Sequence, residues 1–265
     1  MRVTCLASGS SGNALLVCAG DARIVIDCGL SAKRVADELR ALGVHPTDVQ
    51  AVFLSHEHRD HIAGVSVFSK RYHIPVLASE GTLQALGSAA PSLADIVPVG
   101  KTLSVGSISV TSFPLPHDAR ETVGYFLQYG GDSVCVATDL GEVPAELIDY
   151  LRASDLMILE ANHDVDLLIN GPYPSYLKRR VLGRNGHLSN VDSAAAAVRS
   201  ASSRSQSLWL AHLSAVNNSP RIALKTIQER IQREGISTIS VAVALRDRRS
   251  LVWDSSIRAQ GTLGL

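Results

Sequence analysis

The chain has 265 residues, of which 46% are apolar, and its mean hydropathy is +0.14, which is enough apolar material for a sizeable core. Lysine plus arginine equals aspartate plus glutamate at 25 each, so the net charge predicts no acidic partner, and any contact with nucleic acid must come from local clusters of charge. No signal-peptide pattern follows Met1 and no run of 18 apolar residues occurs, so we expect a soluble, cytoplasmic protein with no membrane contact.

The four cysteines show no C-x-x-C spacing, and each lies in or beside an apolar, strand-like run. They are Cys5, Cys18, Cys28 and Cys135. We interpret them as buried, reduced thiols, and not as a disulfide set or a zinc cluster.

The chain opens with three short apolar runs that predict a β-meander, at residues 3–7, 14–19 and 23–27. The first two are joined by Ser-Gly-Ser-Ser-Gly-Asn, whose glycines permit positive φ. Backbone amides here, with Ser10, Ser11 and Asn13, could bind an anion; an ordinary hairpin loop is the alternative.

Asp27 stands at the end of the third run and is followed by an amphipathic helix that we expect to begin after Ser31 as its N-cap and to reach residue 42. A carboxylate at a strand end could support a metal-binding loop or merely cap a turn. We favour support of a metal site.

Residues 49–54 predict a buried strand, and the next seven residues read Ser-His-Glu-His-Arg-Asp-His. Side chains two apart in an extended chain point the same way, so His56 and His58 can bind one metal ion as a pair. Asp60 and His61 follow at a turn and can reach a second ion. Two first-row ions about 3.5–4 Å apart, held by imidazole and carboxylate, commonly hydrolyse phosphoesters. A metal-free, histidine-rich surface turn is the alternative.

The rest of the chain alternates between strand and helix patterns. Strands are predicted at residues 74–78, 96–99, 102–114 (a hairpin), 123–129, 133–137, 156–159, 208–211, 238–242 and 250–253. Helices are predicted at residues 61–72, 81–87, 144–152, 174–182, 191–200 (capped by Ser189 or Asn190) and 220–233. We interpret residues 1–265 as one domain of two mixed halves, the second closed by the last two strands, with a loose tail at about 255–265.

Polar residues recur where these predicted strands end, namely His117, Asp139, Glu160 and His212. His117 follows Pro114-Leu115-Pro116, which stiffens the approach of the chain, although a plain loop histidine is the alternative.

Together these strand-end motifs resemble the metallo-β-lactamase superfamily over nearly the whole chain, in the order Asp27, His56-x-His58-x-Asp60-His61, His117, Asp139 and His212. The resemblance implies an α/β fold, a four-layer αββα sandwich with the metals at one edge between its two sheets. It implies that His56, His58 and His117 bind one metal ion, that Asp60, His61 and His212 bind a second, that Asp139 bridges both, and that Asp27 supports them.

Four further motifs resemble the YycJ/WalJ branch of the superfamily. They are Ser8-Gly-Ser-Ser-Gly-Asn13, Glu160-Ala-Asn-His-Asp164, Gly186-His-Leu-Ser-Asn190 and His212-Leu-Ser-x-x-Asn217-Asn218. The resemblance implies a metal-dependent 5′-to-3′ exonuclease that acts on DNA ends and is linked to repair and its proteins. Retention of His58 indicates a hydrolase, because the redox diiron members that share the pattern replace it with a carboxylate.

His187 is interpreted as a phosphate contact or as the general acid for the leaving oxygen, with Glu160 or Asp164 orienting a histidine partner. A helix-entry residue that stabilises its loop is the alternative. His163 is a candidate for contact with substrate in the same pocket.

Residues 171–190 contain no acid and carry Lys178, Arg179, Arg180 and Arg184, which could bind a phosphate backbone. A solvated helix end is the alternative. Tyr173 and Tyr176 nearby could stack on a base or pack locally.

The sequence thus predicts a phosphodiesterase with two divalent ions, Mn²⁺ or Zn²⁺, in which a hydroxide held by the metals attacks the scissile phosphate. Asp60, Asp27, Glu160 and His187 are the expected catalytic residues. Amides of residues 8–13, with Asn217 or Asn218, would stabilise the developing charge. The alternative is a hydrolase of a small cyclic phosphodiester, thioester or lactam on the same metals; a non-catalytic scaffold is disfavoured because no ligand is missing.

Overall fold

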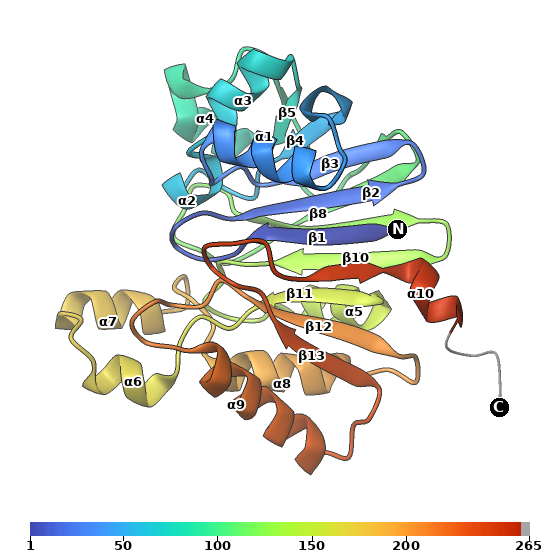
Figure 1. The fold of residues 1–265 in the computed structure, drawn as a ribbon. Coiled ribbons are helices and arrows are strands. Elements are labelled where there is room, and N and C mark those ends of the chain that lie inside the picture. The colour runs from blue at the N-terminus through green and yellow to red at the C-terminus, as the bar shows by residue number, and fades with distance from the viewer. Residues whose placement is uncertain (261–265) are drawn as a thin grey trace.

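The computed structural model describes residues 1–260, whose strands form two seven-stranded sheets. The sheets pack face to face and helices cover their outer faces, so the molecule has four layers (Figure 1). This arrangement confirms the predicted αββα sandwich.

The first sheet has the strand order β14-β1-β2-β3-β4-β5-β6. Its strands are β1 (Arg2–Ala7), β2 (Ala14–Ala19), β3 (Ala22–Ile26), β4 (Ala51–Phe53), β5 (Val76–Ala78), β6 (Ala94–Ile96) and β14 (Val252–Asp254). The first three are antiparallel neighbours, which confirms the predicted meander, whereas β3 to β6 are parallel.

The second sheet has the order β13-β12-β11-β10-β9-β8-β7. Its strands are β7 (Thr102–Val105), β8 (Ile108–Pro114), β9 (Val123–Tyr129), β10 (Asp132–Ala137), β11 (Leu156–Glu160), β12 (Gln206–Ala211) and β13 (Ile239–Val243). The last four are mutually parallel, so their carboxyl ends reach the same edge of the sheet.

The helices form the outer layers and the connections at the sheet edges (Figure 1). They are α1 (Ala32–Ala41), α2 (Arg59–Ile62), α3 (Val65–Tyr72), α4 (Glu80–Leu86), α5 (Ala145–Ala153), α6 (Val165–Asn170), α7 (Ser175–Leu182), α8 (Asn190–Ser200), α9 (Pro220–Arg233) and α10 (Ser255–Gln260), with short 3₁₀ turns at Pro46–Asp48 and Gly87–Ala89. Ser31 caps α1 and Ser189 caps α8, as predicted, by accepting a hydrogen bond from a backbone amide of the first turn.

Apolar side chains fill the three spaces between the four layers. Between the sheets, Phe53 of β4 meets Tyr125 of β9 edge to face, with ring centroids 5.4 Å apart. Leu39 of α1 packs on the outside of the first sheet and Ile227 of α9 on the outside of the second. Burying each such large side chain contributes about 1.5–3 kcal/mol, which holds the four layers together.

The predicted helix at residues 61–72 is wrong as a single element, because the chain forms α2 and α3 with Gly64 at the N-cap of α3. A Cβ at position 64 would lie 2.1 Å from the carbonyl oxygen of Leu30. This close backbone contact, which only glycine allows, is invisible in the apolar spacing of the sequence. Helix α6 was not predicted; Asp164 caps it by accepting from the amide of Leu167 at 3.0 Å.

The end of the chain also differs from the prediction. Strand β14 does not complete the second half but pairs antiparallel with β1, with Val3 opposite Trp253, and covers what would be an open sheet edge. The predicted loose tail differs from the structure at Ser255–Gln260, because these residues form α10. The start of this helix is held where Ser255 N donates to Met1 O at 3.0 Å. Residues 261–265 lie outside the described part of the chain.

The cysteines are unpaired, as predicted. Cys5, Cys28 and Cys135 are buried, whereas Cys18 is half-buried. Burial raises the pKa of Cys5 to about 11 and that of Cys28 to about 12, so both remain protonated thiols at neutral pH.

Candidate metal centre

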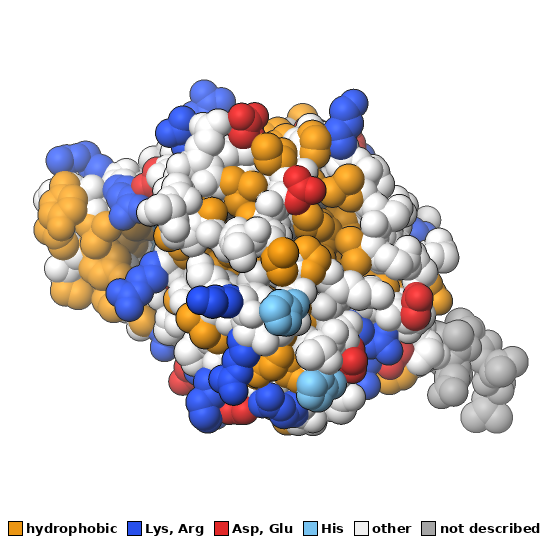
Figure 2. All heavy atoms as spheres, turned by 90° about the horizontal axis from the view of Figure 1, so that it is seen from above, with side chains coloured by type: hydrophobic (Ala, Val, Ile, Leu, Met, Phe, Trp, Pro, Cys, Tyr) orange, Lys and Arg blue, Asp and Glu red, His pale blue; other side chains and the backbone are white. Residues whose placement is uncertain are grey.

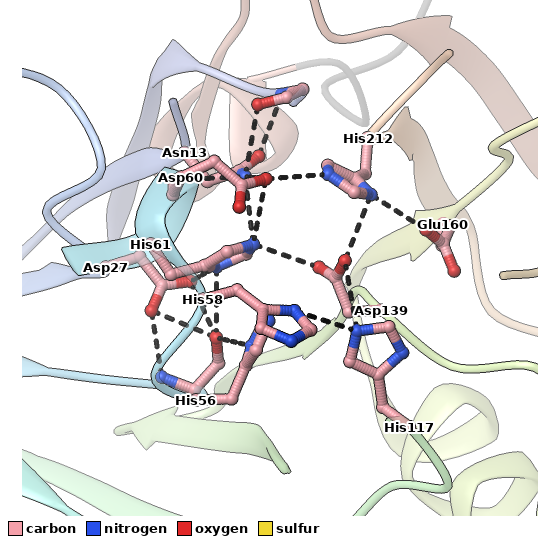
Figure 3. A network of polar contacts seen from close by, with 12 residues as sticks. Asn13, Asp27, His56, His58, Asp60, His61, His117, Asp139, Glu160 and His212 are labelled. Atoms are coloured by element: carbon pink, nitrogen blue, oxygen red, sulfur yellow. Dashed lines mark hydrogen bonds and ion pairs between the residues drawn. The ribbon is translucent and has the colours of Figure 1, made fainter. Parts of the chain in front are cut away.

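Seven predicted metal ligands meet at one edge of the sandwich, where strands of both sheets end (Figure 3). They are His56, His58, Asp60 and His61 from the loop and helix after β4, His117 after β8, Asp139 after β10 and His212 after β12. The fold thus converts seven positions scattered along the sequence into one cluster.

The backbone is left-handed at three residues of this edge. Asp27, Asp139 and His212 have φ angles of 59°, 61° and 54°, a conformation that non-glycine residues rarely adopt. Each follows a strand by one or two residues. Such a conformation costs on the order of 1–3 kcal/mol and persists where the surrounding structure enforces it, commonly at functional sites.

The first ligand group consists of His56, His58 and His117, whose ring nitrogens lie within 4.8 Å of one another. Nε2 of His117 is 3.3 Å from Nδ1 of His58. Nε2 of His56 is buried and has no hydrogen-bond partner among residues 1–260. An orphaned buried polar atom costs roughly 1–3 kcal/mol, and a metal ion would be its partner, so these imidazoles fit a divalent cation.

The second ligand group consists of Asp60, His61 and His212. Oδ2 of Asp60 is 3.2 Å from Nε2 of His212 and 3.6 Å from Nε2 of His61. One carboxylate and two imidazoles converging on one point suit Zn²⁺ and its first-row neighbours.

Asp139 lies between the two groups and is only 2% exposed. Its Oδ2 is 3.1 Å from Nε2 of His61, while its Oδ1 is 3.2 Å from Nδ1 of His212 and 3.9 Å from Nε2 of His117. One carboxylate therefore reaches ligands of both groups, which fits the bridging role that the resemblance implies.

Four ligand histidines have their second ring nitrogen held by a neighbour, and Figure 3 shows the contacts of His61 with Asp27 and of His212 with Glu160. The contacts are His61 Nδ1 with Asp27 Oδ2 at 2.8 Å, His212 Nδ1 with Glu160 Oε1 at 2.8 Å, His56 Nδ1 with Ser55 Oγ at 3.0 Å and His117 Nδ1 with the carbonyl oxygen of Gly186 at 3.0 Å. A carboxylate or carbonyl oxygen only accepts, so the rings of His61, His212 and His117 carry a proton on Nδ1, and Nε2 is the nitrogen that can bind a metal.

The support by Asp27 agrees with the sequence-based expectation, whereas Ser55 and the carbonyl of Gly186 were missed. The amide and hydroxyl of Ser55 donate to Asp27 Oδ1 at 2.8 and 3.0 Å, so Ser55 links two parts of the site. Its position directly before His56 was the only signal for it, and a backbone carbonyl leaves no signal in a sequence.

The histidines compensate the buried carboxylates in the absence of metal. Burial alone would lower the pKa of His61, but the charges of Asp27 and Asp139 outweigh it and raise the pKa to about 10. The pKa of His212 rises well above its usual value for the same reason, whereas burial lowers that of His56. Metal binding at the second group must therefore displace protons.

Glu160 is fully buried and orients two histidines with one oxygen. Its Oε1 accepts from Nδ1 of His187 and of His212, each at 2.8 Å, and its Oε2 accepts from the amides of Leu140 and Leu188 at 3.1 Å. Burial would raise the pKa of Glu160, but the two histidines outweigh it and lower the pKa to about 2. The expected pairing with His187 is present, and the alternative partner Asp164 instead caps α6.

His163 is 1% exposed, and neither ring nitrogen has a hydrogen-bond partner among the described residues. Burial lowers the pKa of its imidazole. Its backbone forms a bridge with Ser189 at the start of α8. The ring is closed off from the surface in this structure, so the predicted contact of His163 with substrate, which would require the ring to become accessible, stays a prediction.

The loop at residues 8–13 contacts the ligands through its two ends. Nδ2 of Asn13 is 3.0 Å from Nε2 of His61 and 3.4 Å from Oδ2 of Asp60, and Oγ of Ser8 accepts from the amide of His212 at 2.9 Å. Ser10 and Ser11 are exposed at the tip of the loop.

The side chains of Asn217 and Asn218 are largely buried, and their predicted role in stabilising charge stays a prediction. Nδ2 of Asn218 donates to the carbonyl oxygens of Ala161 and Asn162 at 2.9 and 3.1 Å, and its Oδ1 accepts from the side chain of Asn190. Asn217 is 1% exposed. Both stabilise the loops around the site.

The basic stretch before His187 is less positive than its sequence indicates. Arg180 forms an ion pair with Asp118, and Nε of Arg184 is 2.6 Å from Oε1 of Glu142. These acids come from distant parts of the chain, so a local charge count could not reveal them. In the described part of the chain Arg179 alone of the three arginines makes no ion pair.

The segment with α6 and α7 projects at the metal-binding edge (Figure 1). On this projection, at the left of Figure 2, apolar side chains are exposed beside Lys and Arg. Tyr176 is 68% exposed, so it does not pack locally.

The comparison with known families fits this geometry. The sequence profile described as the Beta-lactamase superfamily domain matches residues 22–212, most of the chain, with all seven ligands inside the match. The chain belongs to the metallo-β-lactamase superfamily.

Relatives that match nearly the full length define its branch. Exodeoxyribonuclease WalJ of Streptococcus pneumoniae is 36% identical over 232 residues, which cover 85% of this chain and 86% of WalJ. Exodeoxyribonuclease YycJ of Bacillus anthracis is 32% identical over 239 residues, which cover 89% of this chain and 90% of YycJ. The chain therefore belongs to the WalJ/YycJ branch and is a metal-dependent hydrolase.

A solved structure supports the fold independently. The metallo-β-lactamase fold protein YhfI from Bacillus subtilis superposes with a TM-score of 0.72 over 96% of this chain and 99% of YhfI, at 17% identity. Within residues 1–260, no helix is both long and apolar enough to span a bilayer.

Proposed function

We propose that this superfamily member is a 5′-to-3′ DNA exonuclease that hydrolyses phosphodiester bonds at DNA ends. The observation that carries the proposal is the complete ligand set, with His58 and Asp139 in place, in a chain that matches two exodeoxyribonucleases over nearly their full length. A scaffold that had lost catalysis would have no need to keep seven ligands and their supporting carboxylates in strained positions.

The exposed rim of the site suits the end of a polymer. The ligands are mostly buried, but the side chains of His58, Asp60 and His187 are 31%, 22% and 19% exposed. A strand end can therefore approach along this rim, while Asp27, Glu160 and Asp139 stay out of contact with water and keep the ligands oriented.

Two divalent ions are proposed, one held by His56, His58 and His117 and the other by Asp60, His61 and His212, with Asp139 shared. Bound there, they would place positive charge at the scissile phosphate and make a water nucleophile available at neutral pH. Nitrogen-rich ligands favour Zn²⁺, and the carboxylates also accept Mn²⁺, so we propose one of these two metals.

His187 is the proposed general acid. Burial alone would lower the pKa of His187, but Glu160 outweighs it and raises the pKa, which favours the form of the ring that can donate a proton. Because Nδ1 donates to Glu160, the proton that can be given to the leaving oxygen is the one on Nε2. Replacing His187 by alanine should slow turnover while leaving the metals bound.

The test is digestion of 5′-labelled single- and double-stranded DNA, with 5′-phosphate and 5′-hydroxyl ends, by protein loaded with Mn²⁺ or Zn²⁺. We expect release of label from the 5′ end. DNA left intact, with hydrolysis of a small cyclic phosphodiester, thioester or lactam, would show the alternative hydrolase instead.

We also propose that the reaction serves DNA repair, in which 5′ ends are trimmed, and that the partners of the protein are repair proteins. Cells that lack the gene should be more sensitive to agents that break or crosslink DNA. Equal survival with and without the gene would contradict this assignment.

A further inference from the structure

The connection between β13 and β14, residues 244–251, is a basic loop beside the metal centre. It carries Arg246, Arg248 and Arg249. Strand β13 lies parallel to β12, so the loop leaves the sheet at the same edge as His212. In Figure 1 this loop, in red, crosses the front of the sandwich near the loop between β1 and β2.

The loop is fixed in place by hydrogen bonds to the first sheet. Ser8 N donates to Leu245 O at 3.0 Å, and Ser250 N donates to Cys5 O at 3.1 Å. Inside the loop, Leu245 N donates to Ser250 Oγ at 3.1 Å. Since Ser8 Oγ also accepts from the amide of His212, a single residue joins the basic loop to a metal ligand.

The stem of Arg246 is packed as well. A Cβ at position 9 would lie 2.6 Å from Cγ of Arg246, so only glycine leaves room for this side chain against the loop at residues 8–13. Arg246 is half-buried, whereas Arg248 is exposed. The positive charge of Arg246 is thus held by a preorganised stem.

The charge of this loop is largely uncompensated. Arg249 is 3.7 Å from Glu38, and Arg34 of α1 donates to the backbone oxygen of Asp247 and not to its carboxylate. In the described chain neither Arg34, Arg246 nor Arg248 forms an ion pair. Three guanidinium groups therefore remain against the single carboxylate of Asp247.

A hollow of about 270 Å³ lies directly beside Arg246. It is lined by Leu213, Ser214, Ser219, Ala244, Arg246 and Asp247, among others. Leu213, which lines the hollow, directly follows the ligand His212 in the chain. Hydroxyl groups and an arginine are groups that bind phosphate oxygens.

We propose that the β13–β14 loop, with Arg34, binds the sugar-phosphate backbone of the nucleic-acid strand whose end lies at the metal centre. The inference rests on the proposed nuclease function and adds the path of the strand, which runs over the tip of the loop at residues 8–13 and past Arg246 and Arg248. Arginine suits this task because its planar, permanently charged fork matches a phosphate. Two of the three arginines in the stretch before His187 are paired with acids, so this loop is the stronger basic surface.

The first experiment measures binding of the metal-loaded protein to a 5′-phosphorylated, phosphorothioate-linked single strand by fluorescence anisotropy at several salt concentrations. Arg246→Gln with Arg248→Gln keeps the packed stem of Arg246 and removes two charges. We expect at least tenfold weaker binding and a salt slope lower by about 0.7 for each phosphate that the protein no longer neutralises. Arg248→Ala alone, at an exposed position, should show part of the effect.

The matched control is Arg199→Gln with Arg233→Gln. Both arginines are exposed, make no ion pair in the described structure, and lie at the far ends of α8 and α9, which begin at the metal edge. This variant should bind like the unmodified protein. Hydrolysis of bis(p-nitrophenyl) phosphate, which has a single phosphate and no nucleic-acid strand beyond it, should be unchanged in both variants.

A methylphosphonate scan locates the contact. Neutralising successive linkages should weaken binding by the unmodified protein at one or two positions inside the strand, and those positions should have no such effect in the Arg246/Arg248 variant. If that variant binds and digests DNA like the unmodified protein, the loop is not on the strand path, although the nuclease function stands. If the unmodified protein neither binds nor cuts DNA, both the function and this inference fall.

Discussion

Oε1 of Glu160 accepts a hydrogen bond from Nδ1 of His212 at 2.8 Å. The same oxygen holds His187, so one buried carboxylate sets the orientation of a metal ligand and of the proposed general acid. Because the carboxylate cannot donate, it also fixes which nitrogen of each ring is protonated.

Replacing Glu160 by glutamine should therefore affect metal binding and turnover together. Glutamine carries no charge and presents an amide NH₂ in place of one acceptor oxygen. We expect roughly 10- to 100-fold weaker binding of the ion at the group of Asp60, His61 and His212, which is the usual effect of removing the carboxylate that supports a ligand. Metal content after dialysis against a graded chelator measures this. Asp164→Asn is the control, because Asp164 caps α6 and contacts neither histidine; equal metal loss in both variants would refute the role of Glu160.

Asp139→Ala should abolish hydrolysis and reduce bound metal, because its two oxygens reach both ligand groups. Elemental analysis and the DNA digestion assay measure the two effects. Asp149→Ala removes a carboxylate with a side chain that is 78% exposed and should change neither. An active Asp139→Ala protein with two bound metals would contradict the assignment.

Metal affinity should rise with pH. In the metal-free protein the pKa of His61 is raised to about 10, so its imidazole is protonated at pH 7 and must lose a proton to bind an ion; the pKa of His212 is shifted in the same direction. Calorimetry at pH 7 in buffers of different ionisation enthalpy should show a net release of protons on metal binding. Affinity that is independent of pH between about 6.5 and 9 would be inconsistent with these shifts.

Gly29→Ala should disrupt the centre from a position that bears no ligand. A Cβ there would lie 1.6 Å from the carbonyl oxygen of Asp60, so the loop that carries Asp60 and His61 must move. We expect a decrease of about 1–3 kcal/mol or more in unfolding free energy, together with release of metal. Urea unfolding and metal content measure these effects.

The matched control for that substitution is Gly131→Ala. No atom lies within 4 Å of a Cβ at position 131, and its φ is not positive. Its stability and metal content should be unchanged. If Gly29→Ala behaves like this control, the close packing around Asp60 is not a constraint.

The positions of most strands along the chain and the metal motif could be read from the sequence because their signals are local. Apolar runs predict strands, and His56-x-His58-x-Asp60-His61 places its ligands within six positions. The resemblance to a superfamily then supplied His117, Asp139 and His212, which no local pattern connects.

What the sequence could not reveal depends on contacts between distant segments. Asp118 and Glu142 neutralise Arg180 and Arg184 from other loops. Asn218 donates its amide to neighbouring carbonyls, and His163 is enclosed by the fold around it. The position of Arg246 beside the metal centre could be inferred only once β13 was known to pair with β12.

The division of the centre between the two sheets has a consequence for how the protein is made. The loop after β4 is synthesised early, whereas His212 follows β12 near the end of the chain. A ribosome must therefore pass residue 212 before either the second ligand group or the contact between Glu160 and His212 can exist. The first ligand group is complete once residue 117 has been made, so the two groups form at different stages of synthesis, and the second is the later one.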